Sequence, residues 1–511
     1  MRKPFNPFSG KGAEPSRTTG SAPSWLASES RSGRPSGAED ATRRGGLAGS
    51  GGGVDPDGFS SRNAEPLLVR GGLCVVPGHP PQPLDIYLEQ GRIASIGQRL
   101  HVPGCRVLEV GGKYVLPGVV DPHVHIGVFS DYQAEVATET FSALRNGVTT
   151  VGAYVVSQSS YLETLPSMIR RIEEASYTDI FFHLAIFTRE QLEEIPLYHS
   201  RFGITSFKAY MYGIPGIAPS LEDDFLLDLM EAVAALGENA VLSVHAENHR
   251  IIDRATKRLQ KASPRQLALD QWQLAHPVLS EAEAVTRALR LAEESGVTLY
   301  FVHISAAETI GVIRDHRQKG RRFYAETTSP YLTTASDKEQ NPLYKMVPPI
   351  RTEKDRLALW QALKDGLLDS IGTDHTPLSR EQKQPGVSLW ETVPGYPAVG
   401  THVPLLLDGS RRRNMPVEQL VEKTSTNPAR IFGLYPRKGT LLPGSDADLV
   451  IVDPMRKRQI DTGRASSFAD FALHEGETLI GWPVAVCKMG HVISCDDPGT
   501  VHPCGSYLRR A

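Results

Sequence analysis

Six side chains that can bind metal ions or carry protons close predicted apolar strands in this chain. Two of them, His123 and His125, follow the apolar run 114–120 in the sequence Asp-Pro-His-Val-His. Because alternate side chains of a strand share a face, both imidazoles can reach one metal ion. A single histidine at a strand end is usually structural, but the whole set predicts a metal centre. The other four residues are Lys208, His245, His303 and Asp374.

Lys208 needs a separate explanation, because it lies in the mostly apolar sequence Ser-Phe-Lys-Ala-Tyr-Met. Burial of an ammonium group is costly. The lysine could be paired with a carboxylate, or it could carry a modification. Carbamylation by CO2 would give it two anionic oxygens that can bridge two divalent ions. The residues by themselves leave both explanations open.

Strands and helices alternate through the middle of the chain and would position these residues. Strand candidates lie at 149–151, 180–182, 206–210, 241–245, 298–303, 322–326 and 370–374. Helical stretches separate them, and the one at 280–295 begins with Ser280 and Glu283 in the spacing of a capping box. Repeated βα units of this length predict a closed (β/α)8 barrel, in which active sites lie at the carboxyl ends of the strands.

Short β-like segments on both sides of this region predict a small β-sandwich built from both chain ends. The predicted fold class is therefore α/β, a TIM-like barrel with a sandwich domain. We expect a disordered tail rich in Gly, Ser and Arg at 1–65 and the first part of the sandwich at 66–118. The barrel would occupy 119–436, and the second part of the sandwich with the C-terminal tail 437–511.

Composition and charge argue against several classes of partner. The 511 residues carry a formal charge of -3, so we expect neither nucleic-acid binding nor attraction to a membrane. The first sixty-odd residues lack the apolar core of a secretory signal. An organellar targeting segment is the alternative to a disordered tail, and its acidic residues argue against that. The five cysteines form no Cys-x-x-Cys pair and indicate reduced thiols in a cytoplasmic protein.

Longer motifs around the six residues resemble those of the cyclic amidohydrolases, the group of dihydropyrimidinases (hydantoinases), allantoinases and dihydroorotases. The resemblance runs from about residue 66 to 511 and leaves out only the N-terminal tail. It includes Gly-Val-Val-Asp-Pro-His-Val-His at 118–125 and Gly-Thr-Asp-His-Thr-Pro at 372–377. Further matching segments are 206–208, 244–248, 302–305, 326–332, 348–351, 427–434 and 439–453.

The resemblance implies a site with two divalent metal ions, usually zinc. A hydroxide that bridges them would attack the ring carbonyl, since a bound metal lowers the pKa of water to about 7. Asp374 would take the proton and pass it to the leaving nitrogen. The ligands would be His123, His125 and Asp374 for the more buried ion, His245 and His303 for the second, and a CO2-derived carbamate on Lys208 between them.

Three positions depart from the family's pattern and bear on the substrate. Gly127 stands where dihydroorotases carry an arginine for the substrate carboxylate, which favours a ring without a charge there. The oxyanion-binding tyrosine of hydantoinases would fall at Gly213, so Tyr212, one residue earlier, is expected to take that role. Val347 replaces a serine whose backbone contacts the ring amide, and the other ring-amide contact would fall near Thr401.

These observations predict a metal-dependent hydrolase that opens the C–N bond of a small cyclic amide, such as a hydantoin or a dihydropyrimidine. Allantoinase or dihydroorotase activity on a related ring is the alternative. A non-catalytic scaffold homologue would lack metal ligands. A mononuclear deaminase could use Glu247 but would have no bridging lysine. Family members are commonly tetramers, so we expect a homotetramer.

Overall fold

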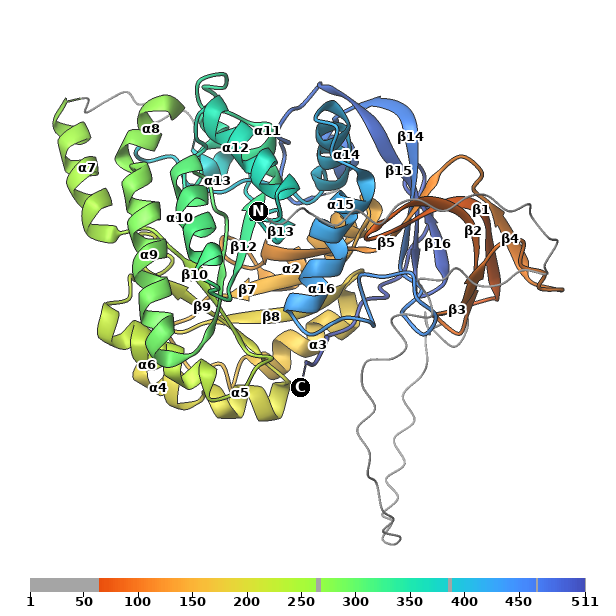
Figure 1. Ribbon diagram of the computed structural model, residues 1–511, viewed down its shortest axis with the longest axis horizontal. Coiled ribbons are helices and arrows are strands. Elements are labelled where there is room, and N and C mark those ends of the chain that lie inside the picture. The colour runs from red at the N-terminus through yellow and green to blue at the C-terminus, as the bar shows by residue number, and fades with distance from the viewer. Residues whose placement is uncertain (1–63, 263–267, 385–387, 466, 511) are drawn as a thin grey trace, which may run out of the picture.

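The computed structural model describes residues 64–262, 268–384, 388–465 and 467–510 (Figure 1). The predicted tail at 1–65 therefore lies outside the described residues except for its last two. A barrel of strands surrounded by helices forms one side of the molecule. A second sheet, which contains both the orange and the blue ends of the chain, forms the other (Figure 1).

Eight parallel strands of the described chain form one sheet in sequential order, which confirms the predicted barrel. The sheet closes where the N–H of His125 donates to the carbonyl of His375 over 2.7 Å, beside a parallel bridge between Val124 and His375. Both faces of these strands are buried, which suits their branched and aromatic residues. The strands are β6 (Val119–His125), β7 (Val148–Val155), β8 (Asp179–Ala185), β9 (Ser206–Tyr210), β10 (Val241–His245), β11 (Thr298–Phe301), β12 (Tyr324–Thr328) and β13 (Ser370–Gly372).

Helices connect these strands and cover the outside of the barrel (Figure 1). No helix within the described ranges is long and apolar enough to cross a membrane. The barrel helices are α2 (Tyr132–Arg145), α3 (Leu165–Ala175), α4 (Arg189–Glu193), α5 (Ile195–Phe202), α6 (Asp223–Ala234), α7 (His249–Ala262), α8 (Leu269–Ala275), α9 (Val278–Ser295), α10 (Ala307–Gln318), α11 (Ser329–Thr333), η3 (Pro342–Tyr344), α12 (Glu353–Lys364) and α13 (Arg380–Lys383). The later helices are α14 (His402–Arg412), α15 (Val417–Val421), η4 (Glu422–Thr426), α16 (Asn427–Ile431) and α17 (Thr462–Ala465).

The start of α9 differs from the prediction. The helix begins at Val278, with Pro277 as its N-cap, so Ser280 already lies in the first turn. There the hydroxyl of Ser280 donates to the carbonyl of Pro277 over 2.7 Å. The predicted capping box between Ser280 and Glu283 is therefore wrong, because the chain becomes helical immediately after the proline.

A second sheet, with eight strands among the described residues, combines both ends of the chain. Strands β5 and β14 pair antiparallel, with Val115 opposite Ile451 and Pro117 opposite Leu449. Side chains from both ends, such as Ile86 and Leu449, share one hydrophobic core, so the two ends depend on each other for burial. The strands are β1 (Leu67–Val76), β2 (His79–Glu89), β3 (Arg92–Gly97), β4 (Arg106–Glu109), β5 (Tyr114–Pro117), β14 (Leu449–Gln459), β15 (Thr478–Lys488) and β16 (His491–Ser494).

A buried cluster of charges joins the second sheet to the barrel. Lys488 Nζ lies 2.6 Å from Asp179 in β8 and 3.0 Å from Asp448, which precedes β14. Lys438 contacts Asp179 as well and lies 2.7 Å from both Asp446 and Asp448. The two ammonium groups occupy the position that a cation would take between the three carboxylates, so this cluster is an ion-pair network.

The last described residues return to the barrel. Tyr507 forms a parallel bridge with Ile180 in β8, and the N–H of Leu508 donates to the carbonyl of Ile180 over 2.8 Å. The guanidinium of Arg510 donates to the carbonyl of Phe182 over 2.6 Å. The C-terminal residues therefore pack against a barrel strand.

Candidate metal centre

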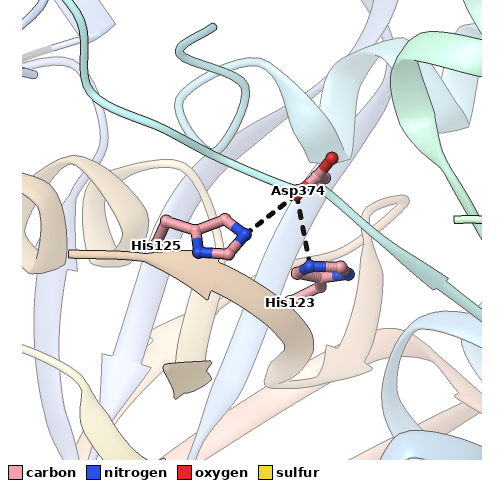
Figure 2. Close-up of side chains that lie close together, drawn as sticks. All are labelled: His123, His125 and Asp374. Carbon is pink, nitrogen blue, oxygen red and sulfur yellow. Dashed lines mark hydrogen bonds and ion pairs between the residues drawn. The ribbon is translucent and has the colours of Figure 1, made fainter. Parts of the chain in front are cut away.

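His123, His125 and Asp374 bring three ligand atoms together at the carboxyl end of the barrel (Figure 2). Both imidazoles project from the same face of β6, and their Nε2 atoms lie 3.2 and 3.1 Å from Asp374 Oδ1. His123 is buried, while the side chains of His125 and Asp374 are 15% and 14% exposed. Imidazole and carboxylate donors that converge in a partly open site suit a divalent metal ion.

The backbone around Asp374 turns the carboxylate toward the two histidines. Strand β13 ends at Gly372, so Asp374 lies beyond the strand that was predicted to include it, with a φ of 54°. A left-handed φ costs energy in a non-glycine residue and is retained where the surrounding structure requires it. Asp121 in β6 supplies such a constraint, because it accepts hydrogen bonds from the N–H and the hydroxyl of Thr373 over 3.0 and 2.6 Å.

Lys208 in β9, His245 at the end of β10 and His303 just beyond β11 lie beside this group. The ring centre of His303 lies 5.5 Å from that of His123 and 4.4 Å from that of His245. His303 follows β11 with a φ of 44°, so it also turns out of its strand. Lys208 Nζ lies 4.6 Å from the ring centre of Tyr154, which is 4.4 Å from that of His123. The structure thus brings all six predicted ligands to one end of the barrel.

Burial changes the chemistry of Lys208. It lowers the pKa of this lysine to about 7, although the carboxylates of Asp374 and Glu326 oppose the shift. Among the described residues, Lys208 forms no ion pair. A large fraction of its amine is therefore neutral near pH 7, and the neutral amine is the form that can react with CO2.

Glu326 in β12 was given no role in the sequence analysis, although it lies directly behind the histidines. Its carboxylate lies 2.8 Å from Nδ1 of His123 and accepts hydrogen bonds from the N–H of His303 and the hydroxyl of Tyr300 over 3.1 and 2.6 Å. Burial raises the pKa of Glu326 to about 8. A carboxylate behind a ligating histidine fixes its orientation and leaves the other nitrogen for the metal.

Glu247 has the same position relative to His245. Its two oxygens lie 2.9 Å from Nε2 of His245 and 3.0 Å from Nδ1 of His276, and all three residues are buried. Burial raises the pKa of Glu247, but the two imidazoles outweigh burial and hold it well below the usual range. Only Nδ1 of His245 remains for a metal. In the described chain, Nδ1 of His303 is buried without a hydrogen-bond partner, so the donors here also fit a bound ion.

We expect Glu247→Gln to weaken metal binding at His245 by about 10- to 100-fold, the usual effect of losing a carboxylate behind a ligating histidine. The neutral amide cannot stabilise both imidazoles as the carboxylate does. Metal content after dialysis against graded chelator concentrations measures the effect. Glu238→Gln, at an exposed position, is the matched control. Equal metal retention in the two variants would show that Glu247 does not support the histidine.

A cavity with mainly apolar walls opens beside Asp374. Val347 lines it, but Thr401 does not. Thr401 directly precedes α14, donates its hydroxyl to the carbonyl of Ala398 and lines a separate cavity against the second sheet. It therefore lies away from the pocket in which its substrate contact was predicted. The lining residues are His125, Val128, Phe129, Tyr210, Ile214, Ile217, Met346, Val347, Asp374, Thr376, Pro394 and Gly395.

Tyr210, and not Tyr212, is the tyrosine that lines this pocket. It follows Lys208 by two residues in β9 and therefore shares its face, with its ring centre 5.2 Å from Lys208 Nζ. Tyr212 packs edge-on against His276, with the ring centres 5.1 Å apart. A tyrosine at Gly213 would not fit this loop, because a Cβ there would come within 2.7 Å of a backbone nitrogen.

The backbone at Gly127 also excludes a larger side chain. Its φ is 77°, and a Cβ at this position would lie 2.8 Å from Cβ of Tyr132. The N–H of Gly127 donates to the carboxylate of Glu135, which holds the loop in this conformation. An arginine cannot be accommodated at this position without a change in the loop.

Comparisons with known proteins agree with this geometry. Residues 114–476 match the family described as the amidohydrolase family. The chain is 31% identical over 422 residues to an L-hydantoinase from Paenarthrobacter aurescens, which covers 80% of this chain and 90% of that protein. It is 32% identical over 450 residues to a D-hydantoinase from Geobacillus stearothermophilus, covering 84% and 93%.

Solved structures give the same result. A crystal structure of a D-hydantoinase superposes with a TM-score of 0.81 at 30% identity and covers 87% of this chain and 99% of that one. The dihydropyrimidinase from Brevibacillus agri has a TM-score of 0.81 at 27% identity with the same coverage. Because the family match spans the whole barrel and the relatives align over at least 80% of the chain, this protein belongs to the amidohydrolase family.

Proposed function

We propose that this protein hydrolyses the C–N bond of a hydantoin or dihydropyrimidine ring that carries an uncharged substituent. The observation that carries the proposal is the cluster of His123, His125 and Asp374 at the mouth of the barrel. The Nε2 atoms of both histidines lie within 3.2 Å of Asp374 Oδ1. An apolar cavity opens beside it. The hydantoinase relatives and the amidohydrolase family support metal-dependent opening of a cyclic amide.

The proposed centre holds two divalent ions, for which zinc suits the imidazole and carboxylate donors. A carbamate on Lys208 would supply the anionic bridge, and the lowered pKa of this lysine supports its formation. When bound, the ions would polarise the ring carbonyl and lower the pKa of water. The ligands would be His123, His125 and Asp374 for one ion, His245 and His303 for the other, and carbamylated Lys208 for both.

Asp374 is the proposed general base and acid. Burial alone would raise the pKa of its carboxyl, but His123 and His125 hold it below the ordinary value. The carboxylate is therefore anionic at neutral pH and can accept a proton from the attacking water. Because it also lines the pocket, it can pass this proton to the leaving nitrogen. The apolar side chains of Phe129 and Val347 would limit access of bulk water to the reacting ring.

The pocket argues against the alternative activities. Dihydroorotate carries a carboxylate, whereas the described lining residues include neither arginine nor lysine, and Gly127 leaves no room for one. Apolar lining residues such as Phe129 and Ile214 disfavour the polar ureido group of allantoin. A mononuclear deaminase would need Glu247 as its acid–base group, but this carboxylate is bonded to two histidines. A non-catalytic scaffold homologue would lack metal ligands, whereas three candidate ligands converge here.

Metal analysis followed by a substrate panel tests the proposed function. The panel contains 5-substituted hydantoins, dihydrouracil, allantoin and dihydroorotate. We expect about two equivalents of metal and the highest kcat/KM on a hydantoin or dihydropyrimidine. Preferred turnover of dihydroorotate would contradict the proposed substrate class. Purified protein that binds no metal and opens none of these rings would overturn the proposal.

The rate of metal uptake by the metal-free protein should depend on pH through Lys208. Only the neutral amine reacts with CO2, and its pKa is about 7. At constant dissolved CO2, recovery of activity should therefore accelerate as pH rises through 7 and level off above it. Metal is added to the metal-free protein, and samples taken at successive times are assayed to give the rate at which activity recovers. A rate that keeps rising toward pH 10 would indicate a lysine with an ordinary pKa.

The two tyrosines can be distinguished by removing one hydroxyl at a time. We expect Tyr210→Phe to lower kcat by about 100-fold, because a donor aimed at the developing oxyanion is worth roughly this much. Tyr212→Phe should change kcat only slightly, since its ring packs against His276. Steady-state kinetics on one hydantoin measure both variants. The reverse order would restore the role that the sequence assigned to Tyr212.

We also propose an assembly and a compartment for this protein. The family resemblance supports a homotetramer, which light scattering coupled to gel filtration would test. The five cysteines are free, which agrees with reduced thiols and supports a cytoplasmic location.

A further inference from the structure

Two buried lysines outside the metal centre hold one irregular stretch of backbone. Lys345 follows η3 and is 3% exposed. Its Nζ donates to the carbonyl oxygens of Leu389, Trp390 and Thr392 over 2.6, 3.2 and 2.6 Å. The ring centre of Trp272 lies 4.2 Å from the same nitrogen. All three donors of this ammonium group are therefore used within one short segment.

Lys383, the last residue of α13, continues this arrangement and is fully buried. Its Nζ donates to the carbonyl oxygens of Lys345 and Val393, each over 2.9 Å, and to that of Gly395. Its backbone carbonyl accepts a hydrogen bond from the N–H of Val393 over 3.1 Å. The N–H of Gly395 in turn donates to the carbonyl of Lys345 over 3.0 Å.

These contacts are unusual because neither lysine pairs with a carboxylate in the described chain. Burial lowers the pKa of Lys345 to about 7, which reflects the cost of keeping an ammonium group there. Carbonyl groups in an irregular segment have no regular backbone partners, and burying them unpaired is also costly. Two ammonium groups with three donors each satisfy six such contacts, so they compensate for the missing secondary structure.

The segments joined by the two lysines form one wall of the pocket beside Asp374. Met346 and Val347 follow Lys345 directly, while Pro394 and Gly395 end the other segment, and all four line the pocket. Lys383 reaches both segments through its contacts to residues 345, 393 and 395. The indole N–H of Trp272 donates to the carbonyl of Met346 over 2.9 Å and holds the first segment from its other side.

We propose that Lys345 and Lys383 are positioning residues that fix this wall, residues 345–347 and 393–395, and thereby determine how tightly the substrate binds. The role of the wall in binding rests on the proposed function. The hydrogen bonds from Lys345 and Lys383 to this backbone, here named the clamp, do not involve the metal centre. Without the clamp the wall must be ordered when substrate binds, and this cost appears in KM. The chemical step, which depends on Asp374, should remain intact.

The test compares Lys383→Met and Lys345→Met with Lys354→Met, an exposed lysine of α12 that serves as the control. Methionine keeps the apolar stem and removes the donors. We expect each clamp variant to raise KM for a hydantoin with a bulky apolar substituent by about tenfold, with kcat and metal content within about twofold of the wild type. Backbone amides of 389–395 should exchange hydrogen for deuterium at least about tenfold faster. The control should show neither change.

The exchange measurement separates failure of the clamp from failure of the proposed function. If the wild-type protein opens none of the cyclic amides, faster exchange at 389–395 would still support the clamp. Unchanged exchange and unchanged KM in both variants would overturn it. Loss of metal or of kcat with unchanged exchange would also overturn it, because the lysines would then act on the metal centre. If one of the two variants does not fold, the variant of the other lysine provides the test.

Discussion

Replacement of Lys208 by methionine should lower kcat/KM by about 1,000-fold or more, because the proposed bridge between two ions is lost. Lys208 is fully buried with a pKa near 7, so methionine of similar length fits the site without introducing a new unpaired charge. The fold should therefore survive while metal content falls. Plasma emission spectroscopy on the purified variant, together with its circular dichroism spectrum, measures both quantities.

A modification on Lys208 can also be detected directly. Native mass spectrometry of the wild-type protein should show the added mass of one CO2, which acid treatment removes. Lys319→Met, at an exposed position, should leave the mass shift, the metal content and the activity unchanged. Lys208→Met with full metal content and full activity would exclude the binuclear centre. The centre would then hold a single ion, bound by His123, His125 and Asp374.

Asp374→Asn should reduce kcat by about 1,000-fold, since proton transfer by a positioned carboxylate accounts for about 100- to 10,000-fold in enzymes. The amide can still offer an oxygen to a metal but cannot accept a proton. The acid limb of the pH–rate profile, which reports protonation of the carboxylate, should disappear in the variant. In the wild type His123 and His125 hold the pKa of Asp374 down, so activity falls only in acid.

Asp365→Asn is the control for this variant, because Asp365 is exposed at the end of α12. Its pH–rate profile should match that of the wild type. If Asp374→Asn kept the acid limb, another group would be the base. Metal content has to be measured in parallel, since a loss of both metal and rate would identify Asp374 as a ligand without showing proton transfer.

The sequence was sufficient for the barrel and for placing the six candidate ligand residues at one end of it. His123 and His125 could be placed on one face because a strand has a fixed period of two residues. His303 and Asp374 could be placed at the same end because the carboxyl ends of parallel strands meet there. Their left-handed φ angles could not be predicted, since these depend on long-range contacts such as that between Asp121 and Thr373.

Contacts between distant segments explain what the sequence analysis missed. Glu247 was considered only as a deaminase base, because His276, which accompanies it, lies 29 positions away in the sequence. Thr401 was assigned by family position, but loop conformation decides which cavity a side chain lines. Tyr210 could have been found, since strand alternation places it on the same face as Lys208. The family position fell on Gly213, so the neighbouring Tyr212 was chosen instead.

The charge cluster of Asp179, Asp446, Asp448, Lys438 and Lys488 has a consequence for cooperativity. Asp179 belongs to the barrel, whereas Lys488 ends a strand of the second sheet, and both are buried. The two parts therefore share buried ion pairs, and removing one partner of such a pair costs about 3–5 kcal/mol. The protein should therefore unfold in a single calorimetric transition. Neither the barrel nor the second sheet should fold when expressed alone.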